Sequence, residues 1–125
     1  MTDLPEEVIK AWDDNTDPVV LTTVDKKGTP NSIYVTCISR YDKSTLVVAD
    51  NYFDKTRKNI LEGSKAVILF ITKTGTSYQV KGSIKLHSSG AIFDDMKKWN
   101  PEKHPGNAAA ALLVEEVFSG SKRLV

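Results

Sequence analysis

The sequence predicts a mainly β protein, a closed or split barrel of six antiparallel strands with short helices. Segments rich in β-branched residues are short, and turn-forming residues separate each from the next. Antiparallel hairpins predominate, and one helical segment is inserted after the third strand. At 125 residues, the chain is expected to form one domain over 1–125 with a sizeable core.

The first expected elements are a helix over Leu4–Asp14 and a β-hairpin. The hairpin pairs Val19–Val24 with Thr29–Ser39, and the turn between them places Gly28 where a positive φ is needed. The residues that recur every four positions on the helix, and so define its apolar face, are Leu4, Val8 and Trp12.

The middle of the chain predicts three further strands and the helix between them. Thr45–Ala49 forms the third strand, and the helix over Lys55–Glu62 ends at Gly63, a typical left-handed C-cap. The fourth strand, Ala66–Thr72, is continuously apolar, as expected for a strand buried on both faces, and Ser77–His87 forms a long fifth strand.

The last third of the chain predicts a helix, a loop and a closing strand. Ala91–Trp99 has the apolar spacing of a helix, and Asn100–Asn107 is a loop because it contains two prolines and a glycine. Ala108–Phe118 has mixed signals, since alanine and leucine favour a helix. We interpret it as the sixth strand, because valines follow and the sheet needs a closing member.

The helix beginning after Asp54 has an unusual charge pattern. Asp54 is a plausible N-cap, but Lys55, Arg57 and Lys58 place three cations in a first turn that is already partly positive. Either these long side chains are simply exposed and screened, or an anion lies at this helix end, held by backbone amides, the Thr56 hydroxyl and the lysine.

The amino-acid composition argues against several classes of protein. Lys and Arg total 17 against 16 acidic residues, so the chain lacks the basic excess typical of nucleic-acid-binding proteins. No apolar run is long enough for a membrane span, and the polar N-terminus does not look like a secretory signal. A single cysteine permits no intrachain disulfide. We therefore expect a cytoplasmic protein.

Self-evident catalytic motifs are absent from the sequence. It contains neither a phosphate-binding glycine loop nor a pair of histidines at metal-ligand spacing, and His87 and His104 are interpreted as ordinary surface residues. Cys37 is expected to pack as a small hydrophobe, and Trp99 either packs in the core or stacks on a planar ligand. Difficult chemistry would therefore need a cofactor.

Three segments in this order resemble the FMN-binding split-barrel family, that of pyridoxamine 5′-phosphate oxidase and the small FMN-binding proteins. They read VVLTTVDKKGTPNSIYVT, LVVADNYFDKTRKNI and YQVKGSIKL. The resemblance implies that Lys55 and Thr56 bind the FMN phosphate. The residues implied along the flavin are Tyr34, Val35 and Thr36 on one strand, and Val48, Ala49, Asp50 and Asn51 at the end of another.

The resemblance also implies a homodimer with FMN at the interface, to which Trp99 or the Asn100–Asn107 loop of the second chain contributes. True pyridoxamine phosphate oxidases are much longer and have further arginine and histidine contacts to the substrate phosphate near the C-terminus. In this sequence only Lys122 and Arg123 resemble these contacts, and only weakly. A small FMN-dependent oxidoreductase or electron carrier, acting on an unidentified small-molecule or protein partner, is therefore the expected function. The alternative is a non-catalytic barrel that binds another phosphorylated or tetrapyrrole ligand.

Overall fold

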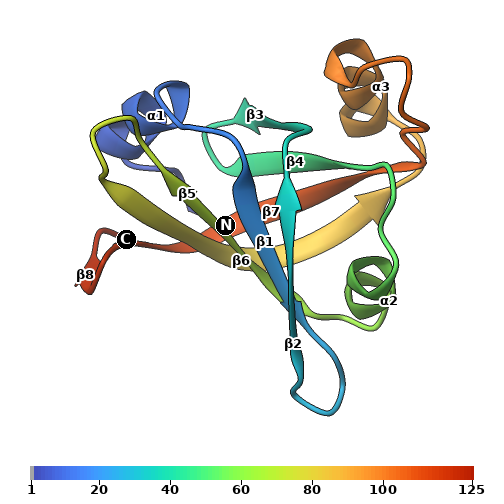
Figure 1. Ribbon diagram of the computed structural model, residues 1–125, viewed down its shortest axis with the longest axis horizontal. Helices are drawn as coiled ribbons and strands as arrows, with labels where there is room; N and C mark the ends of the chain where they lie inside the picture. Colours follow the sequence, from blue (N-terminus) through green and yellow to red (C-terminus); the bar gives the residue numbers. More distant parts are fainter. Residues whose placement is uncertain (1) are drawn as a thin grey trace.

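The computed structural model describes residues 2–125, and its main feature is one curled antiparallel sheet that forms a half-barrel (Figure 1). The strands follow the order β2-β1-β5-β6-β7-β4-β3, and the short β8 pairs with the end of β7. Their bounds are β1 Val19–Val24, β2 Pro30–Val35, β3 Ile38–Asp42, β4 Thr45–Asp50, β5 Lys65–Ile71, β6 Ser77–His87, β7 Ala108–Ser119 and β8 Lys122–Arg123. The predicted mainly β split barrel is thus confirmed.

The number of strands differs from the prediction. The sheet has eight strands rather than six, because the expected strand Thr29–Ser39 is two strands and because β8 follows β7. β2 pairs only with β1 and β3 pairs only with β4, so these consecutive strands form the two opposite edges of the sheet. The chain crosses between the two edges at Thr36 and Cys37, where the barrel is split.

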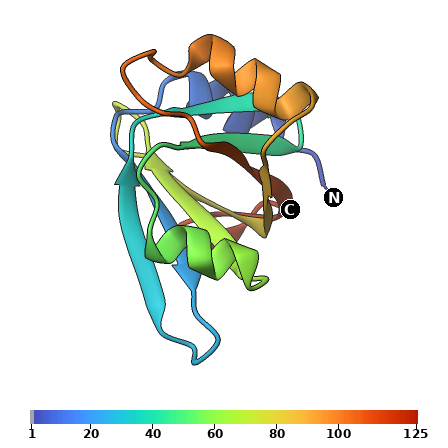
Figure 2. The same ribbon diagram turned by 90° about the vertical axis from the view of Figure 1, so that its right-hand side faces the viewer.

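Three helices surround the sheet: α1 Glu6–Asp13, α2 Lys55–Leu61 and α3 Ala91–Trp99. Helix α2 lies beside the β1–β2 hairpin, and α3 lies across β3, β4 and β7 (Figure 2). Helix α2 ends one residue earlier than predicted, with Glu62 as its C-cap, and the following Gly63 has the expected positive φ, 92°. The predicted apolar face of α1 is confirmed, because its Val8 and Trp12 and the preceding Leu4 are all buried.

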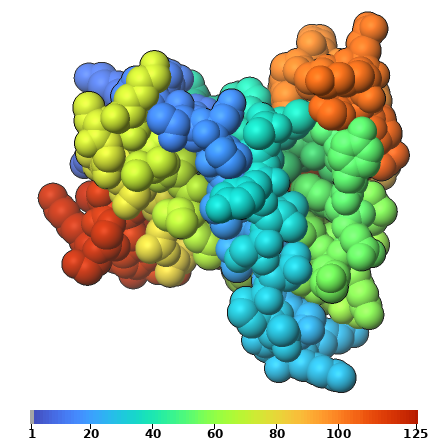
Figure 3. Space-filling model, in the orientation of Figure 1, coloured from blue at the N-terminus to red at the C-terminus, as the bar shows by residue number. Residues whose placement is uncertain are grey.

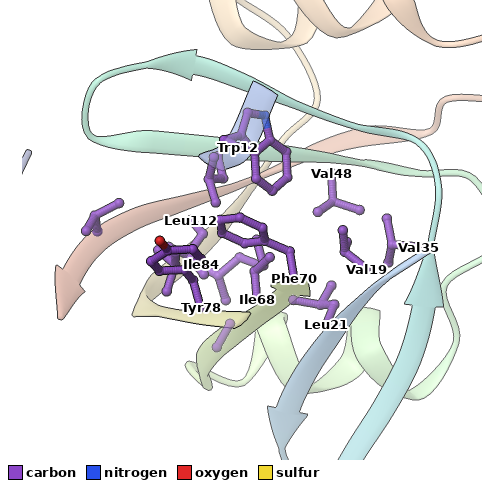
Figure 4. Close-up of a cluster of buried hydrophobic side chains, with 14 of the residues drawn as sticks. Trp12, Val19, Leu21, Val35, Val48, Ile68, Phe70, Tyr78, Ile84 and Leu112 are labelled. Carbon is purple, nitrogen blue, oxygen red and sulfur yellow. The ribbon is translucent and has the colours of Figure 1, made fainter. Parts of the chain in front are cut away.

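The main hydrophobic core fills the inside of the curled sheet (Figure 4). Trp12 closes it from the α1 side and meets Phe70 edge to face, with ring centroids 5.0 Å apart. A second, smaller cluster lies between α3 and the outer face of β4 and β7, and its buried members are Val47, Ala49, Met96, Ala109 and Ala111. β4 and β7 are therefore packed on both faces, which holds these two strands firmly in place.

Candidate functional site

A cleft of about 290 Å³ lies where β2 leaves the sheet and β4 ends. We call it the apolar cleft, since most of the surface that lines it is carbon. The lining residues are Ile33, Tyr34, Val35, Thr36, Cys37, Ala49, Asn51, Tyr52, Phe53 and His104. The strand crossover thus brings the end of β2, one edge of the sheet, beside the end of β4.

A smaller hollow of about 150 Å³ continues from the apolar cleft toward α2, and we call it the Lys55 pocket. The two share Ile33, Tyr52 and Phe53, so they form one connected depression. The remaining lining residues are Asn31, Asp54, Lys55 and Thr56. The space-filling view shows the surface of β2 and of the α2 segment beside it (Figure 3).

Two polar side chains in the Lys55 pocket are organised by the β1–β2 hairpin. The Asn31 amide donates a hydrogen bond of 3.1 Å to Thr56 Oγ1, although Thr56 is almost fully buried. Because that oxygen accepts from Asn31, the hydroxyl proton of Thr56 is free to donate to a ligand. Asn59 on the same helix donates to Thr23 Oγ1 at 3.0 Å, which ties α2 to β1.

The predicted capping role of Asp54 is wrong. Asp54 occupies the N-cap position of α2, but its side chain makes no capping hydrogen bond. The carboxylate that organises the helix start belongs to Asp50, whose oxygens accept two hydrogen bonds from Arg57, at 2.7 and 2.8 Å. The same carboxylate accepts the Phe53 backbone N–H at 3.1 Å. One of the three cations of the first turn therefore has a partner within the protein.

Asp50 is buried, with only 1% of its side chain exposed, whereas 39% of the Arg57 side chain is exposed. The hydrogen bond from Arg57 to Asp50 raises the pKa of the guanidinium above its usual value, so Arg57 stays charged at any ordinary pH. Asp50 was predicted to face a flavin, but its carboxylate is fully engaged within the protein. It acts on the cleft by fixing the loop between β4 and α2.

Asn51 is the second buried polar residue at the end of β4. Its side chain exchanges two hydrogen bonds with Asn100, of 3.1 and 2.9 Å, and its Oδ1 also accepts the Gly106 N–H at 2.9 Å. Asn107 donates from its backbone N–H to the carbonyl of Asp50, at 2.9 Å. This network ties the loop after α3 to the wall of the apolar cleft.

The loop after α3 brings His104 to the mouth of the apolar cleft. His104 Nδ1 and the Tyr52 hydroxyl share a hydrogen bond of 3.1 Å, and their rings meet edge to face. A neighbouring pocket of about 400 Å³ extends from here toward α3 and is also lined by Thr36, Cys37 and Trp99. His104 is therefore part of the cleft, although the sequence suggested an ordinary surface residue.

The structure places the ten residues implied by the resemblance in three groups. Those that line the apolar cleft or the Lys55 pocket are Tyr34, Val35, Thr36, Ala49, Asn51, Lys55 and Thr56. Val48 and Asp50 do not line either one: the Val48 side chain is in the main core, and Asp50 is buried against Arg57. Trp99 lies one pocket further along, where its indole N–H donates to Asp95 at 3.3 Å.

Three residues that the sequence did not single out help to form the two pockets and their supports: Asn31, Tyr52 and Asn100. His104, interpreted from the sequence as an ordinary surface residue, lies at the cleft mouth. Asn51 and Asn100 are 49 positions apart, and no periodicity relates them. Asn31 directly follows Pro30, the first residue of β2.

Among residues 2–125, no group of three or more histidine, cysteine or carboxylate side chains is arranged to hold a metal ion. In the same part of the chain, no helix has both the length and the apolar character required to cross a bilayer.

The curled sheet, the crossover between its edges and the cleft at that crossover define a split β-barrel protein. The family model described as Pyridoxamine 5′-phosphate oxidase matches residues 5–120. The chain belongs to this family, as the resemblance of its three segments indicated.

The chain is similar to several known proteins over most of their length. An uncharacterized protein of Methanocaldococcus jannaschii is 30% identical over 122 residues, which cover 93% of this chain and 80% of the relative. The crystal structure of HupZ from Group A Streptococcus is similar with a TM-score of 0.79 and 25% identity, over 93% of each chain. An FMN-binding protein from Syntrophomonas wolfei has the same fold, with a TM-score of 0.70 and 20% identity over 90% of this chain and 82% of its own.

Proposed function

We propose that this protein is an FMN-binding flavoprotein that works as an oxidoreductase or electron carrier. The observation that carries the proposal is the connection of the apolar cleft to the Lys55 pocket. One end offers a wall of β-strand and mostly apolar surface, and the other offers an ammonium group and a hydroxyl. A flat ring system with a phosphate tail has this distribution of apolar and anionic groups.

The residues of the Lys55 pocket fit a phosphate. A phosphate monoester carries nearly two negative charges at neutral pH, and charge-assisted hydrogen bonds to an ammonium group suit it. Lys55 supplies the charge, and the Thr56 hydroxyl, held by Asn31, supplies a directed donor. No side chain caps the start of α2, so the backbone N–H groups of its first turn receive no hydrogen bond from a capping side chain. Of the three cations in the first turn of α2, Arg57 is paired with Asp50, and a bound phosphate would be the partner of Lys55.

The apolar cleft fits a planar ring. In an antiparallel pair, alternate residues direct their N–H and C=O groups away from the partner strand. The turn bonds place Asp25 and Thr29 in a hydrogen-bonded pair, so by alternation Ser32 and Tyr34 direct theirs toward the free edge of β2. These backbone groups and the short Ala49 side chain would hold and orient the ring. When bound, FMN supplies the redox chemistry, because it accepts and returns electrons singly or as hydride.

The same free edge supports a homodimer with the cofactor at the interface. Tyr34 on β2 is 79% exposed and Tyr52 beside the cleft is 72% exposed, which are high values for tyrosines around a binding site. A second subunit on this face would cover them, and Trp99 or the loop that follows it would then reach the cofactor of the other subunit.

The proposal is tested by titrating cofactor-free protein with FMN and following flavin fluorescence. We expect saturable binding to the wild type, and about tenfold or greater weakening in Lys55→Ala, since a charge-assisted hydrogen bond is worth about 1.5–3 kcal/mol. Lys98→Ala, an exposed lysine of α3, is the matched control and should bind FMN normally.

Light scattering of the same samples should give the mass of a dimer, and Trp99→Ala should alter the affinity for FMN or the flavin fluorescence. A wild-type protein that stays colourless and ignores added FMN would overturn the proposal. In that case, a thermal-shift panel of phosphorylated and tetrapyrrole ligands would identify the alternative occupant.

A further inference from the structure

A second and larger depression adjoins the Lys55 pocket on the side away from the apolar cleft. It has a volume of about 480 Å³ and lies between the β1–β2 hairpin and α2. We call it the basic groove. Its lining residues are Asp25, Lys26, Lys27, Thr29, Pro30, Asn31, Lys55, Lys58, Asn59 and Glu62.

The charges around the basic groove are unbalanced. Lysines from both the hairpin and the helix face it, and the two carboxylates present are already engaged. Asp25 Oδ1 accepts the backbone N–H groups of Lys27 and Thr29, each at 2.9 Å. Glu62 lies 3.8 Å from Lys26. In the part of the chain that the structure describes, no carboxylate forms an ion pair with Lys27, Lys55 or Lys58.

The position of the basic groove decides what it can bind. The basic groove shares Asn31 and Lys55 with the Lys55 pocket. A ligand whose phosphate lies in the Lys55 pocket can therefore extend directly into the groove. An anionic extension fits the groove, because unpaired lysines line it. Aromatic side chains are absent from its lining, so charge rather than base stacking must hold the ligand.

We propose that the basic groove binds the second phosphate of a flavin dinucleotide whose first phosphate lies in the Lys55 pocket. This inference rests on the proposed function and adds that the cofactor site accepts a flavin extended beyond its monophosphate. Lys27 and Lys58 approach the groove from opposite sides, from the hairpin turn and from the helix, and together provide the charge that a second phosphate requires.

The test compares FAD with FMN on the cofactor-free full chain by isothermal titration calorimetry. At low salt, FAD should bind about threefold to tenfold more tightly than FMN, the gain expected from two partly exposed charge contacts. In Lys27→Ala/Lys58→Ala the difference should disappear, while the affinity for FMN changes less than about twofold. Near 0.5 M salt the wild type should lose most of the difference as well, because exposed charges are screened.

Two controls separate this inference from simpler explanations. Lys43→Ala/Lys98→Ala removes the same charge from exposed positions outside the groove and should keep the preference for FAD. FMN together with free AMP should not reproduce the gain, because the two phosphates are then not linked. Tight FMN binding without any preference for FAD, or a preference that survives Lys27→Ala/Lys58→Ala, would overturn the inference alone. Failure of both flavins to bind would overturn the proposed function too.

Discussion

Asp50 and Asn51 are consecutive, buried and polar, yet they hold the two ends of the cleft by different interactions. Asp50 carries a charge and binds Arg57, which fixes the start of α2 and therefore the Lys55 pocket. Asn51 is neutral and exchanges amide hydrogen bonds with Asn100, which fixes the loop that carries His104 beside the apolar cleft. The two residues thus connect one strand end to two walls of one depression.

The comparison shows why each end uses its own kind of contact. Only the Arg57 side of the Asp50–Arg57 pair is open to solvent, so this cation loses less hydration than it would in the core. The Asn51–Asn100 pair is buried on both sides, where neutral amides that satisfy each other avoid the cost of burying a charge. Breaking each one separately should therefore loosen one end of the cleft and leave the other intact.

The largest effect is expected from Arg57→Ala. This change leaves the buried Asp50 carboxylate with only the Phe53 N–H as a partner. We expect a loss of about 2–3 kcal/mol in the free energy of unfolding, below the full cost for a deeply buried pair because Arg57 is partly exposed. Urea denaturation measures this loss. Arg57→Lys, which keeps the charge but not the paired hydrogen bonds, should lose less.

Amide exchange of Arg57→Ala should quicken in α2 and stay unchanged in the Asn100–Asn107 loop. If amide exchange quickened equally in α2 and in the loop, the Asp50–Arg57 and Asn51–Asn100 contacts would not be independent of each other.

A smaller loss, of about 1–2 kcal/mol, is expected from Asn51→Ala. The Asn100 side chain and the Gly106 N–H then lose their partners in a buried place. Here amide exchange should quicken in the loop around His104, while α2 stays protected. Asn107→Ala is the control, because its side chain makes only a long hydrogen bond of 3.3 Å to the Asn51 carbonyl. Comparable destabilisation by both variants would contradict the central role of Asn51.

The smallest effect is expected from Asp54→Ala. Since the Asp54 side chain makes no capping hydrogen bond, its removal should change the free energy of unfolding by less than about 0.5 kcal/mol. Thermal unfolding of this variant sharpens the comparison, because it shows that Asp50 rather than Asp54 stabilises the start of α2. A loss of about 1 kcal/mol or more would indicate that Asp54 caps the helix in solution.

Much of the fold follows from local patterns. The bounds of β1, β6 and α3 agree with the predicted segments, and the alanine-rich segment Ala108–Phe118 is the strand that the sheet required. The division into β2 and β3 was missed, because no glycine or proline interrupts Asn31–Tyr41 and the crossover is imposed by the closing of the barrel. Local propensity contains no information about such a tertiary constraint.

The site was predictable only where a motif is continuous in sequence. Lys55 and Thr56 follow from one short segment, and the structure places them in one pocket. The contacts between Asn51 and Asn100 and between Tyr52 and His104 join distant positions, so a single sequence holds no signal for them. The role that the resemblance implies for Asp50 stays a prediction; what the structure adds is that its carboxylate accepts from Arg57.

The alanines of β7 have one more consequence. Ala109 and Ala111 face α3 while Ala110 faces the main core, so this strand carries single-carbon side chains on both faces. Such a strand acts as a thin partition, across which a helix and a barrel interior pack at close range. A bulkier residue there would act as a wedge under α3. The spacing between Trp99 and the strands beneath it is therefore set by the small size of these alanine side chains.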